Sequence, residues 1–168
     1  MRCLLLCNSI VVDNGVYKCD SPDELCLVSY CRYLGGMLLS KQGSECRIMV
    51  NGETEDWVVQ KELEFSSERK RMSVLACNPA LNRYLLFSKG ADDMILARSR
   101  RSGEWNGLDC ARNVETIVET LKQYADQGLR TLVMGVRNLD ETEYLEFVAN
   151  VEEASKAMAN RDQVKSEW

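Results

Sequence analysis

The sequence contains no histidine and only two prolines among its 168 residues. Without histidine, the chain lacks both the general base of a Ser–His–Asp triad and any imidazole metal ligand. No apolar run approaches the roughly 20 residues that a membrane-spanning helix needs. The apolar start MRCLLLC is short and lacks the cleavage site of a signal peptide. These absences predict a soluble chain without histidine-based catalysis.

Two common phosphate-binding motifs, GxxxxGK[ST] and GxGxxG, are also missing. No nucleophile–base pair is evident. The net charge is −5, and acidic and basic residues are mixed along the chain without a dense basic stripe. This distribution argues against a nucleic-acid-binding protein.

Cysteine is abundant by comparison, with eight residues but no CxxC pair. A zinc site of four thiolates is possible in principle, although the spacing does not favour one. Cys31 lies between Leu27 and Leu34 on one face of an expected helix, where any small apolar residue would serve. We therefore expect reduced thiols, several of them buried.

The apolar pattern predicts one domain with an α+β fold, in which helices pack on an antiparallel sheet. The chain length suits one domain or one module of a larger chain. The turn Asn51-Gly52-Glu53 is a strong hairpin signal. The expected strands are 37–41, 45–51, 55–66, 71–78, 83–89 and 130–136, and the expected helices are 1–11, 22–34, 91–98, 110–127 and 140–158.

The stretch DSPDEL has the pattern of a helix start. Ser21 fits the N-cap, Pro22 the first helical position, and Glu24 the third, which together form a capping box. The alternative is that the carboxylate of Glu24 faces a ligand. The stretch alone does not decide between the two interpretations.

The stretch EFSSERKRMSVLA places a run of three cations, Arg69-Lys70-Arg71, after a strand. Such a run is usually a solvated hairpin tip, but it can also form a cationic edge that faces phosphate. Phe65 lies at the strand end beside this run. An aromatic face next to cations is what a nucleotide requires, because the ring stacks on the base and the cations meet the phosphates.

Two further stretches carry single cations. In FSKGADDMIL a strand delivers Lys89, and Gly90 permits close approach of a backbone or a ligand. Asp92 and Asp93 occupy the following helix start and would repel a phosphate there, so Lys89 would have to hold any anion. In GLRTLVMGV, Arg130 opens an expected strand. The alternative is that both cations are simply exposed.

Taken in order, SPDE, EFSSERKRMSV, KGAD and GLRTL resemble the signature blocks of the nucleotide-binding domain of type-IV P-type ATPases, the phospholipid flippases. The first two blocks favour that branch over the cation pumps. The tail LDETEYLEFVANVEEASKAMANR resembles the helical segment that follows in the same branch. The resemblance therefore covers nearly the whole chain, from about Tyr17 to Arg161.

This resemblance implies a twisted antiparallel sheet flanked by helices. It also implies an ATP-binding domain that presents the terminal phosphate to an aspartate elsewhere in a larger protein. The residues that the resemblance assigns to the nucleotide pocket are Phe65 against the adenine, Glu24 near the adenine, Lys89 in the base pocket, Arg130 towards the ribose and phosphates, and Ser67 and Arg71 in the same pocket.

The phosphorylated DKTGT segment, the GDGxNDV metal segment and all membrane helices of that family are missing. We therefore expect residues 1–168 to be one cytosolic domain excised from a membrane ATPase, able to bind nucleotide but not to turn it over. Mg²⁺ would be bound mainly by absent domains. Asp93 stands where relatives usually carry a neutral residue, which favours a lower affinity.

The implied partners are the phosphorylation and actuator domains of the same parent chain, with a possible accessory subunit. The resemblance implies neither nucleic-acid binding nor direct membrane contact by this domain. Two alternatives remain open at this point: the nucleotide-binding domain of a cation-transporting P-type ATPase, and a non-catalytic interaction domain in which the motifs are only caps and turns.

Overall fold

The computed structural model describes residues 1–105 and 107–156. Its centre is a six-stranded sheet in which every neighbouring pair is antiparallel, in the order β10-β7-β6-β5-β4-β3. This confirms the predicted α+β class. The strands of the sheet are β3 (Gly36–Gln42), β4 (Glu45–Val50), β5 (Glu53–Ser66), β6 (Arg71–Asn78), β7 (Arg83–Gly90) and β10 (Val133–Leu139).

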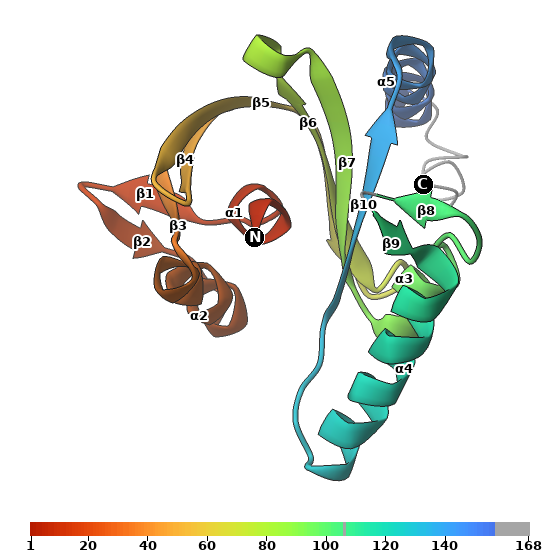
Figure 1. Ribbon diagram of the computed structural model, residues 1–168. Coiled ribbons are helices and arrows are strands. Elements are labelled where there is room, and N and C mark those ends of the chain that lie inside the picture. Colours follow the sequence, from red (N-terminus) through yellow and green to blue (C-terminus); the bar gives the residue numbers. More distant parts are fainter. Residues whose placement is uncertain (106, 157–168) are drawn as a thin grey trace.

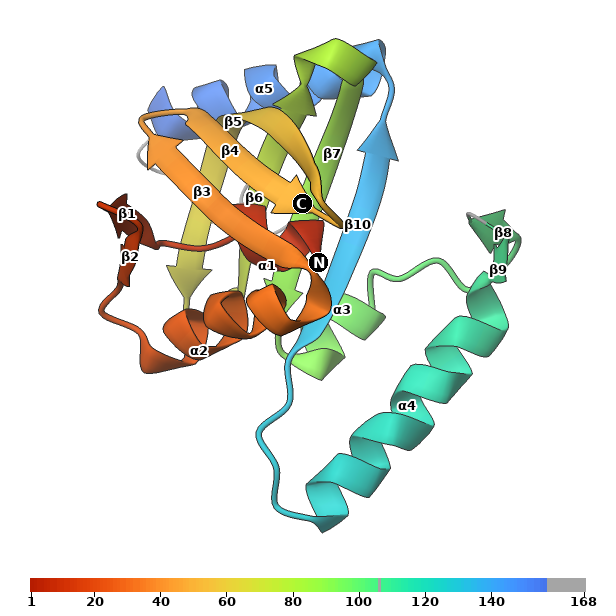
Figure 2. The same ribbon diagram turned by 60° about the vertical axis from the view of Figure 1, so that its left-hand side comes forward.

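The sheet curves around the short helix α1, which lies inside the bend, whereas α5 packs on the opposite face (Figure 1). Helices α2 and α3 lie at one end of the sheet, and α4 stands to one side of it (Figure 2). The helices are α1 (Arg2–Leu6), α2 (Pro22–Tyr30), α3 (Asp92–Leu96), α4 (Cys110–Asp126) and α5 (Glu141–Lys156).

Each face of the sheet buries its own apolar cluster. On the concave face, Leu5 and Leu6 of α1 are fully buried against Phe87 and its neighbours. On the other face, Phe147 of α5 is fully buried against Leu75 and adjacent residues. Alternate residues of β6 and β7 therefore point to different helices, as strand geometry requires.

Strand β10 begins three residues later than the sequence predicts. Val133 pairs with Gly90, the last residue of β7. Beyond Gly90 the chain leaves the sheet for α3, so Arg130 has no strand to pair with and lies in the connection before β10. The predicted strand start at Arg130 is wrong for this reason.

Two further boundaries differ from the prediction. The expected helix 1–11 ends at Leu6, because the amide of Asn8 donates to two carbonyl oxygens at the end of α1. The expected helix 22–34 is α-helical to Tyr30 and continues as a 3-10 turn, η1 (Cys31–Leu34). The last two residues of the expected helix 140–158 lie outside the described residues.

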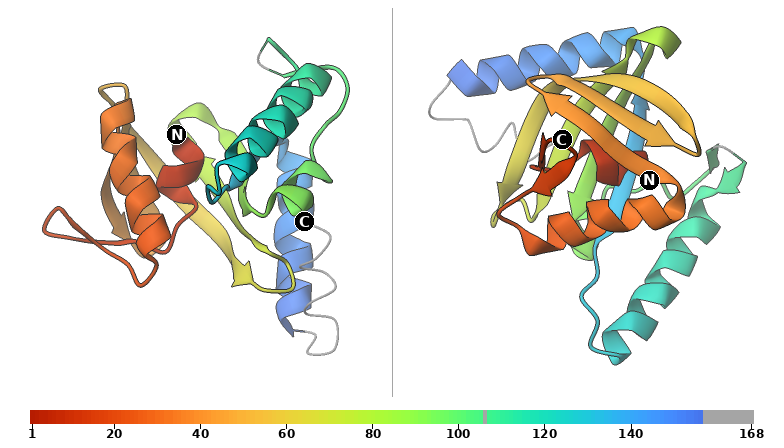
Figure 3. Two further views of the ribbon diagram at one scale, coloured as in Figure 1. Left: turned by 90° about the horizontal axis from the view of Figure 1, so that it is seen from below. Right: turned by 90° about the vertical axis from the view of Figure 1, so that its left-hand side faces the viewer.

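Two small hairpins were not predicted. The first joins β1 (Val11–Asp13) to β2 (Val16–Lys18), and the second joins β8 (Glu104–Trp105) to β9 (Leu108–Asp109). A further turn, η2 (Pro79–Leu81), connects β6 to β7. The first hairpin packs beside β3, one of the two edge strands of the sheet, and the view from below shows it projecting from the body (Figure 3).

All eight cysteines are free, as the sequence predicts, and Cys31 is fully buried. No helix within the described ranges combines the length and the apolar character needed to cross a bilayer.

Among the glycines that the structure describes, Gly90 has the closest approach of another backbone segment. A β-carbon on Gly90 would lie 2.4 Å from the carbonyl oxygen of Lys70 and 2.6 Å from the β-carbon of Arg71. The next amide, that of Ala91, donates to the same carbonyl oxygen at 3.0 Å. The sequence predicts that either a backbone segment or a ligand comes close to Gly90. In the structure, the backbone at Lys70 and Arg71 does so.

We predict that Gly90→Ala lowers the free energy of unfolding by about 1–3 kcal/mol, the usual cost of overpacking. Urea denaturation measures this change. The matched control is Gly135→Ala on the neighbouring strand, where the new methyl group would lie at an ordinary 3.5 Å from the side chain of Ile95. Equal stability of the two variants would contradict the prediction.

Candidate functional site

Antiparallel register places the predicted motifs in one row across the sheet. Ser66 of β5 pairs with Arg71 of β6, Arg71 pairs with Gly90 of β7, and Gly90 pairs with Val133 of β10. Three of the four sequence blocks therefore meet at one end of the sheet. The fourth block, at the start of α2, is joined to them by side-chain contacts.

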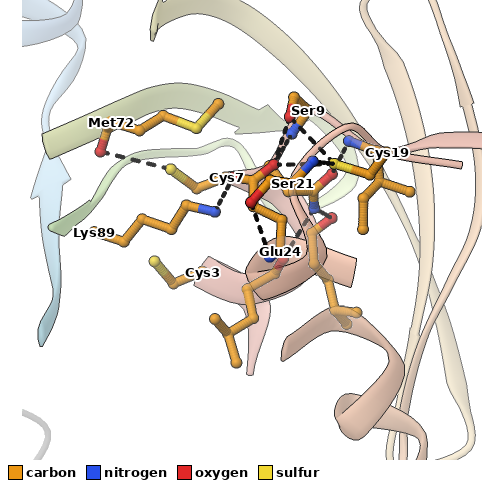
Figure 4. A network of polar contacts seen from close by, with 12 residues as sticks. Cys3, Cys7, Ser9, Cys19, Ser21, Glu24, Met72 and Lys89 are labelled. Atoms are coloured by element: carbon orange, nitrogen blue, oxygen red, sulfur yellow. Dashed lines mark hydrogen bonds and ion pairs between the residues drawn. The ribbon is translucent and has the colours of Figure 1, made fainter. Parts of the chain in front are cut away.

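The central contact of this end is an ion pair between Lys89 and Glu24. The ammonium group of Lys89 donates to Oε1 of Glu24, and the two side chains are only 8% and 15% exposed (Figure 4). Lys89 shares the concave face of the sheet with Phe87, two residues earlier. The interpretation of Lys89 as a simply exposed cation is therefore wrong.

The second carboxylate oxygen of Glu24 has its own donors. The backbone amide of Ser9 donates to Oε2 at 2.9 Å, the Ser9 hydroxyl donates to the same atom, and the thiol of Cys19 lies 3.6 Å from it. Burial would raise the pKa of this carboxyl, but the hydrogen bonds from Lys89 and Ser9 outweigh it and lower the pKa to about 2. Glu24 is therefore ionised at neutral pH.

Helix α2 keeps only half of the predicted capping box. The hydroxyl of Ser21 accepts from the amide of Glu24 at 3.4 Å, which confirms Ser21 as the N-cap. The return bond is absent, because the carboxylate of Glu24 is turned towards Lys89 and the amide of Ser21 donates to the sulfur of Cys19 instead. Ser21 therefore caps α2, whereas the carboxylate of Glu24 serves the ion pair with Lys89 and takes no part in capping.

Arg130 reaches the same end of the sheet from the connection before β10. Its Nη2 lies 2.7 Å from Oδ2 of Asp23, which precedes Glu24 in α2. Its side chain is 87% exposed. The structure therefore brings Arg130 to the start of α2 and leaves its guanidinium open to solvent, where an exposed pair contributes little to stability.

The cationic run divides into buried and exposed members. The guanidinium of Arg69 donates to the carbonyl oxygens of Leu63, which pairs with Ser73 of β6, and of Glu64, which lies in the β5 bulge that begins after Leu63. Arg71 is almost fully buried on the face away from Lys89, and burial lowers its pKa to about 10. Arg69 and Arg71 therefore belong to neither a solvated tip nor a cationic edge.

Lys70 is the member of the run that remains exposed, with 56% of its side chain accessible. Its φ is 50°, and its carbonyl contacts Gly90 and Ala91, so it stands beside the end of β7. Its ammonium lies 3.7 Å from Asp93, the residue expected to weaken anion binding. Sequence reasoning did not single out Lys70, because nothing in the run distinguishes it from its two neighbours.

Phe65 and Ser67 lie at the surface where β5 turns into β6. Phe65 is 63% exposed, because the bulge between Leu63 and Ser66 interrupts the strand register. Ser67 is exposed in the turn itself. A cavity of about 390 Å³ opens beside Phe65, within the size range of small-molecule sites. Its other lining residues are Glu62, Leu63, Glu64, Ser66, Glu68 and Arg69.

Two thiols of the α1 segment stand beside Lys89 (Figure 4). Cys7 donates to the carbonyl oxygen of Met72 at 3.7 Å, and Cys3 donates to that of Ser88 at 3.8 Å. The hydrogen bond to Cys3 and burial both raise the pKa of Cys7. Cys7 therefore stays a neutral thiol and adds no charge to the ion pair.

Metal ligands are not assembled in the part of the chain that the structure describes: no three acidic or cysteine side chains there gather closely enough to hold an ion. The groups that this end of the sheet does present include an exposed aromatic ring, two exposed cations that each pair with an aspartate, and a buried ion pair. That donor set fits an aromatic base carrying an anionic tail better than it fits a metal ion.

The family model described as "P-type ATPase, cytoplasmic domain N" matches residues 1–167. The chain belongs to this family. Among curated proteins, this N domain is 38% identical to phospholipid-transporting ATPase dnf2 of Schizosaccharomyces pombe and 35% identical to phospholipid-transporting ATPase IK of Mus musculus. These matches cover 95% and 96% of the N domain, but only 11% and 12% of the two relatives.

A third relative, phospholipid-transporting ATPase 2 of Arabidopsis thaliana, is 33% identical over 95% of the N domain and 14% of its own length. The N domain thus spans about an eighth of the curated relatives it matches. The relatives named here are all phospholipid-transporting ATPases, in agreement with the branch that the SPDE and FSSERKRMSV blocks favour.

The lowered pKa of Glu24 predicts a specific loss of stability in acid. The folded-state pKa of about 2 lies below the ordinary value of 4.5, so the stabilisation is complete above about pH 4.5 and disappears as the pH falls towards 2. Urea denaturation between these pH values should show a steeper decline for the wild type than for Glu24→Gln, which cannot titrate. Parallel declines would show that Glu24 is not held as the structure indicates.

Proposed function

We propose that this N domain binds ATP and presents its terminal phosphate to an aspartate in the phosphorylation domain of a phospholipid-transporting P-type ATPase. The observation that supports the proposal most directly is the row from Ser66 to Val133, because it gathers Phe65, Lys89 and Arg130 at one end of the sheet. The relatives are named as phospholipid-transporting ATPases, which supports the substrate class of the parent.

In the proposed complex the ring of Phe65 stacks on the adenine, since it is largely exposed at this end of the sheet. Lys89 and Glu24 form the polar wall of the base pocket as a pair. The exposed cations Arg130 and Lys70 face the ribose and the phosphates.

Two of the six residues predicted for the pocket, Ser67 and Arg71, have other roles in the proposed complex. Ser67 lies at the rim, exposed in the turn after Phe65, and can contact nucleotide only there. Arg71 points to the face opposite Lys89, so we assign it to the support of the β6 end rather than to nucleotide contact.

The expected affinity is low. One stacked base contributes about 1–3 kcal/mol, and exposed cations add modestly because water screens them. After the cost of association, a dissociation constant of order millimolar is expected. Asp93 lowers the affinity further, because it sits 3.7 Å from Lys70 and partly neutralises it. Weak binding suits a domain that must release ADP after each transfer.

The parent protein would supply what this domain lacks. We propose that the phosphorylation and actuator domains of the parent act on the bound ATP, that Mg²⁺ accompanies its phosphates and is held mainly outside this chain, and that the domain lies on the cytosolic side of the membrane. The N domain alone should therefore bind ATP without hydrolysing it.

The alternative from another class is a non-catalytic interaction domain, and an ATP titration separates the two. Backbone amide NMR shifts should change saturably up to several millimolar ATP, with the largest changes at Phe65, Lys70, Lys89 and Arg130. Inorganic triphosphate is the control, since it should perturb the cations but not Phe65. An absence of saturable change at these residues would remove the nucleotide-binding function.

Phe65→Ala should weaken ATP binding by about 10-fold, the equivalent of one lost stacking contact. The free energy of unfolding should stay within about 0.5 kcal/mol of wild type, because the ring is largely exposed. The matched control is Leu81→Ala, which removes an apolar side chain of 57% exposure in the turn between β6 and β7. Isothermal titration calorimetry should find that Leu81→Ala binds ATP as tightly as the wild type. Equal losses of ATP affinity in Phe65→Ala and Leu81→Ala would contradict a stacking role for Phe65.

A further inference from the structure

Ser9 lies in the loop between α1 and β1 and directs both of its polar groups at one atom. Its amide donates to Oε2 of Glu24 at 2.9 Å, and its hydroxyl donates to the same oxygen. From the other side, the thiol of Cys19 lies 3.6 Å from this oxygen. Oε1 is left for Lys89, so the two carboxylate oxygens have separate partners (Figure 4).

We propose that Ser9 and Cys19 are positioning residues that fix the carboxylate of Glu24 on Lys89 and thereby set the nucleotide affinity of the pocket. The inference rests on the proposed ATP-binding function for its last step. The first step, the hold on Glu24, is independent of any ligand.

The position of Ser9 is determined by the residue before it. Asn8 is fully buried, its amide nitrogen donates to two carbonyl oxygens of α1 at 2.9 Å each, and its Oδ1 accepts from the amide of Ile10 at 3.0 Å. The ammonium of Lys41, on β3, donates to the carbonyl oxygen of Asn8. The amide of Ser9 is therefore aimed at Glu24 by groups from α1 and from the sheet.

Cys19 gives a weaker hold from the end of the β1–β2 hairpin. Its sulfur accepts from the amide of Ser21 at 3.4 Å and lies 3.6 Å from the hydroxyl of Ser9. Thiols are poor donors compared with hydroxyls, so Ser9 should contribute more than Cys19. The sulfur also occupies the place at Ser21 that Glu24 would take in a capping box, which frees Glu24 to face Lys89.

The charges around Glu24 make this hold measurable. Lys89 faces it from β7 with the neutral Cys7 nearby, and Asp23, its neighbour on α2, is turned towards Arg130. The donors from Ser9 thus oppose burial in keeping Glu24 ionised. Losing the hydroxyl of Ser9 should loosen the carboxylate and let it protonate more easily.

The experiment follows the side-chain carboxyl of Glu24 by NMR in the nucleotide-free chain as the pH is lowered, with Glu24→Gln used for assignment. Ser9→Ala should move the titration midpoint upward by about one pH unit, and Cys19→Ala should move it in the same direction by less. Ser9→Thr keeps the hydroxyl and should restore the wild-type midpoint. Thr116→Ala, which removes an exposed hydroxyl from α4, is the matched control and should leave the midpoint unchanged.

The second measurement is the ATP dissociation constant at neutral pH. It should rise about 3- to 10-fold in Ser9→Ala and return to the wild-type value in Ser9→Thr. An unchanged Glu24 titration midpoint in Ser9→Ala would overturn the inference. So would a midpoint that moves in Ser9→Ala while its ATP affinity stays at the wild-type value, if Glu24→Gln does bind ATP more weakly. If the midpoint moves while neither Ser9→Ala nor Glu24→Gln alters affinity, the hold on Glu24 stands and its proposed role in ATP binding is wrong.

Discussion

The buried ion pair between Glu24 and Lys89 is the interaction on which this end of the domain depends. It joins residues 65 positions apart, one at the start of α2 and the other near the end of β7. Removing both charges from water is costly, and the cost is recovered only when each remaining lone pair finds a donor. Ser9 and Cys19 supply those donors, and buried Asn8 fixes the loop that carries Ser9. The ion pair and its donors thus connect α2 and β7 to the loop after α1 and to the end of the first hairpin.

This arrangement has a direct consequence for the proposed ligand. Glu24 and Lys89 neutralise each other, so a nucleotide meets a polar but uncharged wall at that point. The positive charge available to phosphates comes instead from Lys70 and Arg130, which are exposed and only loosely paired with Asp93 and Asp23. Exposed cations screened by water give modest affinity, whereas the buried pair gives a fixed geometry. The domain would therefore combine a well-defined base pocket with weak attraction for the phosphates.

Sequence patterns located most of the fold but misjudged the charged residues. Alternation found all six strands of the sheet, and the Asn51-Gly52 turn stands where predicted, with positive φ at both residues. The first hairpin was missed although Asn14-Gly15 is a strong turn signal, because its strands are only three residues long. The burial of Arg69 was not predictable, since its guanidinium donates to carbonyl oxygens at the edge of a bulge that no residue pattern marks.

The same reasoning explains why four separated blocks identify the domain while no single one does. Ser66, Arg71, Gly90 and Val133 are neighbours through register alone, and register depends on strand pairing rather than on the chain between the strands. The connection that contains α4 can therefore vary without moving the row, because it leaves the sheet after Gly90 and returns at Val133. What must be kept is the residue at each strand end: a glycine where Lys70 approaches, a lysine within reach of Glu24, and an aromatic ring in the bulge of β5.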